Sequence, residues 1–121
     1  ESSLESGMSA MASANRCYGT GVKFLDVQVC LNSNGNIKAS VGVFGLVADS
    51  IVIKPGQARR SGHVTTAIPG LPGVVQEFST TWIVQWSGTT VRRVRVQATL
   101  KGWDFGRGWY KIASLDRVII D

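Results

Sequence analysis

The chain has 121 residues, with 13 basic and 8 acidic side chains that give a formal net charge of +5. This length fits one domain with a hydrophobic core of its own. The apolar content of 44% excludes bulk disorder, and no apolar run approaches the ~20 residues of a membrane-spanning helix. The charge favours a negatively charged partner, although a charge of this size also serves solubility alone.

The first 15 residues are small and polar and lack strand character. Ala12-Ser13-Ala14 resembles a cleavage site, but no apolar region precedes it. We expect residues 1–15 to be a flexible segment, either the remnant of a processed leader or a vector-derived remnant. Residues 16–121 are expected to form a single β domain.

Abundant glycine and few lysines and glutamates favour strands and turns over helices. Alternating apolar residues and turn signals such as Asn34-Gly35 predict about eight strands. The fold class is therefore predicted to be all-β, a single-domain antiparallel sandwich or small barrel. The expected strands lie at 22–31, 37–44, 46–54, 63–68, 74–87, 90–101, 109–113 and 117–120.

The hairpin at 74–101 carries the main functional prediction. Gly88-Thr89 fits a two-residue turn that needs positive φ at its first position, which places Trp86 opposite Val91. Strict alternation then places Arg93 opposite Val84 and Arg95 opposite Trp82. The other face, with Ile83 among Val94, Val96, Ala98 and Leu100, is then the core face.

Two interpretations of the aromatic and arginine face remain open. If it is exposed, Trp82 and Trp86 beside Arg93 and Arg95 form a surface on which bases or sugar rings stack near bound phosphates. If a second sheet covers it, Trp82, Val84 and Trp86 are core residues. The second outcome is the usual one for tryptophan.

Cys17 and Cys30 are the only cysteines, and His63 is the only histidine. Their spacing does not match a zinc site, so we expect no metal and no cofactor. We expect Cys17 and Cys30 to form a disulfide, which places the protein in an oxidising compartment, secreted or at the cell surface.

Two further sets of residues suggest function. His63 and Glu77, with an arginine such as Arg93, offer the acid, base and charge clamp of a small secreted hydrolase. A lone histidine is more often an ordinary strand residue. The expected loop at 102–108 places Arg107 between Trp103 and Trp109, as a sugar-stacking platform or as a loop pinned to the core.

We predict an exported basic binding module rather than an enzyme, with an anionic polymer, a glycan or an acidic protein surface as partner. The alternatives are a small secreted nuclease or glycan hydrolase and a self-assembling structural subunit. Arg59 and Arg60 are expected at the tip of an exposed loop. The predicted ligand-binding residues are Trp82, Trp86, Arg93, Arg95, Arg59, Arg60, Trp103, Arg107 and Trp109.

Overall fold

The computed structural model describes residues 16–67 and 73–121, so the predicted flexible segment 1–15 lies outside the described residues. The described chain consists of strands joined by short connections. The eight strands are β1 (Arg16–Val22), β2 (Leu25–Leu31), β3 (Ile37–Val43), β4 (Leu46–Ile53), β5 (Arg59–Ala67), β6 (Val75–Ser87), β7 (Thr90–Asp104) and β8 (Gly108–Ile120).

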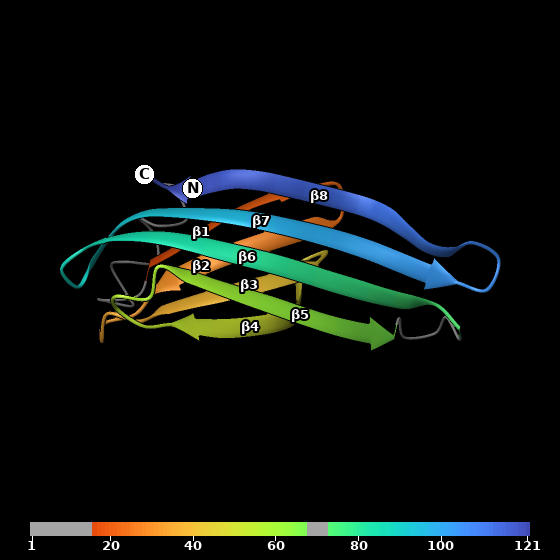
Figure 1. The fold of residues 1–121 in the computed structure, drawn as a ribbon, viewed down its shortest axis with the longest axis horizontal. Coiled ribbons are helices and arrows are strands. Elements are labelled where there is room, and N and C mark those ends of the chain that lie inside the picture. Colours follow the sequence, from red (N-terminus) through yellow and green to blue (C-terminus); the bar gives the residue numbers. More distant parts are fainter. Residues whose placement is uncertain (1–15, 68–72) are drawn as a thin grey trace.

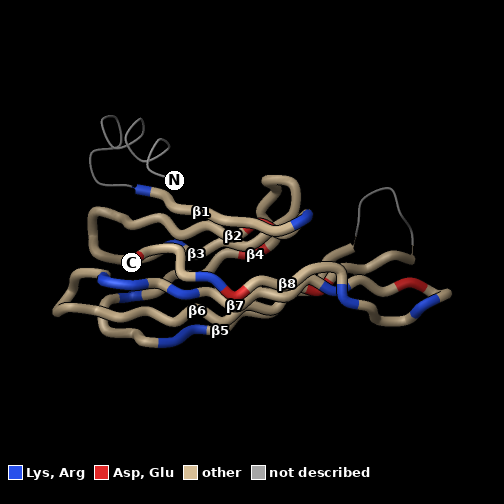
Figure 2. The backbone as a smooth tube through the Cα atoms, turned by 90° about the horizontal axis from the view of Figure 1, so that it is seen from above, with Lys and Arg blue, Asp and Glu red and all other residues tan. Residues whose placement is uncertain are grey.

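The strands form two four-stranded antiparallel sheets in sequence order, β1-β2-β3-β4 and β5-β6-β7-β8. The two sheets pack face to face as two layers (Figures 1 and 2). At the borders of the layers, β4 contacts β5 and β1 contacts β8. The predicted all-β sandwich is confirmed.

The second sheet is longer than the first, because β6, β7 and β8 have 13, 15 and 13 residues. The turn end of the β7–β8 hairpin therefore extends past the first sheet (Figure 2). Within residues 16–67 and 73–121, the first sheet does not cover the side chains at this end.

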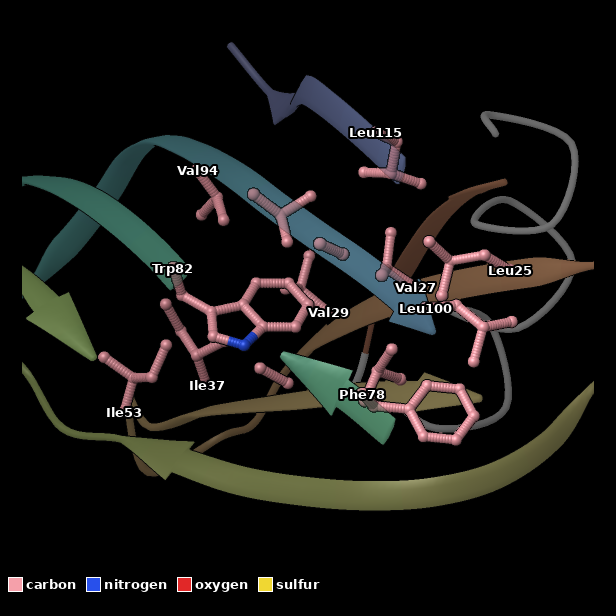
Figure 3. Packing of buried hydrophobic residues seen from close by; sticks show 14 of the residues in the cluster. Leu25, Val27, Val29, Ile37, Ile53, Phe78, Trp82, Val94, Leu100 and Leu115 are labelled. Atoms are coloured by element: carbon pink, nitrogen blue, oxygen red, sulfur yellow. The ribbon is translucent and has the colours of Figure 1, made fainter. Parts of the chain in front are cut away.

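The core lies between the sheets and follows the two-residue alternation of the strands. Leu25, Val27 and Val29 of β2 are buried against apolar side chains of β6 and β7. The indole of Trp82 lies in the middle of this cluster, near Ile37 and Val29 (Figure 3). Its side chain is 1% exposed, so the inward interpretation of Trp82 is the one that the structure supports.

The predicted register of the long hairpin is wrong beyond its first two pairs. Trp86 does lie opposite Val91, and Gly88 has the expected positive φ of 64°. The next pair is Gln85 with Arg93, so Arg92 is an extra residue, a β-bulge. The bulge shifts every later pair by one residue.

As a result, Arg95 lies opposite Ile83, Val94 opposite Val84, and Val96 opposite Trp82. Ile83 and the two arginines share the outward face, and the tryptophan belongs to the core. The predicted pairing of Arg95 with Trp82 is therefore wrong, and the arginine that does lie opposite Trp82 is Arg60 of β5.

Three strand assignments also need correction. The expected strand at 22–31 is divided between β1 (Arg16–Val22) and β2 (Leu25–Leu31), because Lys23 takes a positive φ of 51° and turns the chain there. The two short strands expected after residue 108 form one strand, β8, whose bulges disturb its alternation. Arg59 and Arg60 begin β5 and do not lie at a loop tip.

Cys17 and Cys30 form a disulfide between β1 and β2, as predicted. The bond joins the edge strand β1 to its only neighbour within the first sheet. It closes a loop with a sequence separation of 13, and a closure of this length stabilises a fold by about 3 kcal/mol.

Candidate functional site

The candidate site is the face of the second sheet that points away from the first sheet, which we call the outer face. The register aligns its side chains in rows across β5 to β8. The middle rows are mostly hydroxyl and amide side chains, and the rows at both ends carry basic residues. The middle rows contain Ser61, Thr81, Gln97, Asp116, His63, Ser79, Thr99 and Ser114.

One end of the outer face combines a tryptophan pair with a lysine pair. Trp103 lies directly opposite Trp109, and Lys101 lies directly opposite Lys111. The side chain of Trp109 is 51% exposed. Glu77 lies opposite Lys101 on the other side, on β6, but neither lysine makes an ion pair with it or with another carboxylate of the described ranges. Flat apolar rings and two unpaired ammonium groups therefore lie side by side at the uncovered end of the sheet.

Near the other end, Arg95 is held by Asp116. Its Nε donates a hydrogen bond of 2.7 Å to Oδ1 of Asp116, and its Nη2 donates one of 2.7 Å to Oδ2. These bonds, supported by one from Gln97, lower the pKa of Asp116 to about 2. The carboxylate balances the charge of Arg95, so this arginine offers less to a ligand than an unpaired one.

The structure brings two of the three predicted catalytic residues together. His63 Nε2 lies 2.7 Å from Glu77 Oε2 on the outer face. Arg93 is opposite Gln85, six residues along β6 from the partner of His63, which is a separation of about 20 Å. The predicted set of acid, base and charge clamp is not assembled.

Three other predicted ligand-binding residues have structural contacts. Trp82 is buried and has no surface to offer a ligand. Trp86 packs at the border of the core and donates a hydrogen bond of 2.8 Å to the carbonyl of Gln57. Arg60 donates one of 2.9 Å to the carbonyl of Val52 and so joins β5 to β4.

Arg107 lies in the β7–β8 turn, where its guanidinium is 4.0 Å from the centre of the Tyr110 ring. Its Nε is also 3.6 Å from a carboxylate oxygen of Asp104. Asp104 in addition accepts two backbone hydrogen bonds within the turn. These contacts order the turn that carries the tryptophan pair.

Sequence reasoning missed Lys101 and Lys111 as candidate residues. Their spacing in the chain gives no hint of proximity, because the pairing depends on a bulge in β8 between the positions paired with Leu100 and Lys101. Sequence reasoning also missed an apolar tip at the end of the first sheet, where the ring centres of Phe24 and Phe44 are 5.0 Å apart. The two exposed phenylalanines in turns were the available signal.

A hollow of about 300 Å³ lies over the outward side of the first sheet. Gly19, Gly42 and Ser40 contribute to its lining with Gln28 and Asp26. Asp26 accepts a hydrogen bond of 2.9 Å from the backbone of Gly45. The only charged side chain in this lining is a carboxylate, so the hollow does not suit an anionic ligand.

The fold and the site define the protein as a two-sheet β-sandwich with one polar, aromatic and basic outer face. Comparison with known proteins found no similar family model, curated sequence or solved structure. Residues 16–67 and 73–121 include no helix that could cross a membrane. In the same ranges, no cluster of three or more histidine, cysteine, aspartate or glutamate side chains could hold a metal ion.

Proposed function

We propose that this protein is an exported binding module whose outer face holds a linear acidic polysaccharide. The observation that carries the proposal is the pairing of Lys101 with Lys111 beside Trp103 and Trp109. Aromatic faces stack on flat rings, and the neighbouring ammonium groups pair with the acidic substituents of the same polymer. The disulfide supports an oxidising, extracellular setting.

The density of charge favours a polysaccharide over nucleic acid. Unpaired basic side chains on the described outer face are spread from Arg93 to Lys101 along eight residues of β7, about 26 Å. Duplex DNA carries one negative charge per ~1.7 Å of its axis. Four cations over this length suit a polymer with more widely spaced charges. They are Arg59, Arg93, Lys101 and Lys111.

The middle rows of the outer face also suit a sugar polymer. Ser79, Thr99 and Ser114 align across three strands, and Gln97 lies one row away. Hydroxyl and amide groups both donate and accept hydrogen bonds, as sugar hydroxyls do. A polysaccharide lying along the strands would meet these groups between the basic ends.

Affinity electrophoresis in gels containing polygalacturonate tests the proposal, with neutral dextran as the control polymer. Lys101→Gln with Lys111→Gln should abolish most of the retardation in polygalacturonate. Lys38→Gln with Lys54→Gln, which removes the same charge from the other sheet and its following turn, should leave it nearly unchanged. If both double variants lose the same amount of retardation, the retardation depends on net charge alone, and the proposed site is contradicted.

A second candidate function is hydrolysis of a polymer on the same face, and the His63–Glu77 contact is the observation that favours it. A histidine bonded to a carboxylate is a common source of acid–base chemistry. Release of new reducing ends from polygalacturonate, lost on His63→Ala and on Glu77→Gln, would establish an enzyme. Binding without any release would leave the binding module.

A further inference from the structure

Arg93 has a polar atom that the protein itself leaves unsatisfied. Its Nε is buried and has no hydrogen-bond acceptor among the residues that the structure describes. An unmade hydrogen bond of a buried charged group is costly, and native proteins keep few of them. The Nε atom itself is covered by protein, so an anion would meet this guanidinium through its Nη groups and would compensate the charge that the protein leaves unpaired.

The Arg93 side chain lines a small hollow on the outer face. The hollow has a volume of about 100 Å³, and its other lining residues are Ile83, Gln85 and Arg95. Arg59 lies directly across from Ile83 on the neighbouring strand. Basic segments of β5, β7 and β8 gather toward this end of the second sheet (Figure 2). The space is several times that of one water molecule.

The bulge at Arg92 is the reason that Arg93 reaches this position. Without the extra residue, strict alternation places Arg93 opposite Val84. With it, Arg93 pairs with Gln85 on the outer face. Bulges commonly re-aim a side chain next to a functional site. They also leave the extra residue outside the ladder, and Arg92 is accordingly exposed.

The second arginine of the hollow has a fixed orientation. Two hydrogen bonds of 2.7 Å tie Arg95 to Asp116, and Gln97 supports the same carboxylate. Because Asp116 balances Arg95, the positive charge of Arg93 remains uncompensated at the hollow. The Gln85 side chain adds N–H donors with no charge. The lining thus offers several donors and a net positive charge.

We infer that this hollow binds one compact oxyanion, a sulfate, phosphate or carboxylate group, with Arg93 as its main donor. The inference rests on the proposed function for the source of that group, which is then a substituent of the bound polymer. A free inorganic anion is the other source with the same chemistry. Charge-assisted hydrogen bonds from a guanidinium suit all of these groups.

The test is a sulfate titration at constant ionic strength, followed by the arginine Nε–H signals in NMR spectra. Arg93→Gln removes the donor, and Arg92→Gln is the control that removes the same charge from the next residue. We expect one Nε–H signal to shift with a saturating curve in the wild type and in Arg92→Gln, and to be absent in Arg93→Gln. No saturating shift, or equal responses in the two variants, would overturn the inference.

Polygalacturonate then separates this inference from the proposed function. If the polymer supplies the group, Arg93→Gln should weaken its binding by about tenfold or more, because hydrogen bonds to charged groups are of that strength. Sulfate binding at Arg93 without any polymer binding would support the hollow as a site for free anions and refute the proposed function. If Arg93→Gln leaves polymer binding unchanged and sulfate causes no Nε–H shift, the anion site in the hollow is refuted and the proposed function is not.

Discussion

Lys101 and Lys111 lie directly opposite each other on adjacent strands, and neither forms an ion pair within the described chain. Like charges in this arrangement repel and destabilise a sheet, and Glu77, the cross-strand neighbour of Lys101 on β6, is bonded to His63 and not to the lysine. The tryptophan pair lies in the next row of the same face. A negatively charged ligand between the lysines would turn the repulsion into attraction, so the pair fits a binding role better than a stabilising one.

The variant Lys111→Glu should therefore separate stability from binding. Replacing the repulsion by an attraction should raise the free energy of unfolding by about 0.5 kcal/mol, while the affinity for polygalacturonate falls. Urea unfolding and affinity electrophoresis measure the two effects. Lys38→Glu makes the same change of charge on the other sheet, and a similar loss of binding there would argue against a role specific to the pair.

The Trp82 side chain should be the most costly tryptophan to remove. Its burial in the core predicts that Trp82→Ala lowers the free energy of unfolding by about 3–5 kcal/mol. Trp109→Ala should cost about 1 kcal/mol or less, because half of that side chain is exposed. Chemical denaturation of both variants checks the prediction, and comparable losses would show that the core is placed wrongly.

Asp116 should make folding stability depend on pH in the acid range. Its pKa is lowered from 3.8 to about 2 by the hydrogen bonds from Arg95 and Gln97. A lowered pKa in the folded state stabilises the fold above the unfolded value, and this stabilisation is lost as the pH falls from about 4 to about 2. Asp116→Asn should lack this dependence. The melting temperatures of the two proteins, compared across that range, should converge at its lower end.

At position 44, glycine in place of Phe44 should give a more stable protein than alanine does. Phe44 has a positive φ of 51° and is followed by Gly45 at 77°, a turn geometry that favours residues tolerant of the left-handed region. Phe44→Gly should be more stable than Phe44→Ala by about 1 kcal/mol, because only alanine keeps the backbone strain. The ring contact with Phe24 is lost in both variants. Alanine equal to or better than glycine in thermal melts would be the contrary result.

Much of the fold was predictable because alternation and turn chemistry are local. The buried residues Leu25, Val27 and Val29 follow the alternation that predicts a strand, and Gly88 was predicted as the first turn residue. Arg93 and Arg95 were wrongly placed on the face of Trp82, because one extra residue in a strand reverses every later side chain. Val91 and Val94, three positions apart, break the alternation and were the available signal for that bulge.

The site was less predictable than the fold. Trp103 and Trp109 were proposed as ligand-binding residues from their place around a glycine-rich turn, and the structure pairs them on one face. The lysine pair beside them depends on a β-bulge, which no local pattern in β8 revealed. The contact between His63 and Glu77 likewise depends on the pairing of β5 with β6. Pairings between distant segments are set by the whole sheet.

The indole N–H signals of the four tryptophans test the proposed binding face most directly. In an NMR titration with polygalacturonate oligomers, the signals of Trp103 and Trp109 should shift with a common dissociation constant that increases with salt. The signals of Trp82, in the core, and Trp86, bonded to Gln57, should stay in place. Shifts confined to Trp82 and Trp86, or no shift at any of the four, would contradict the proposal that the outer face binds an acidic polysaccharide.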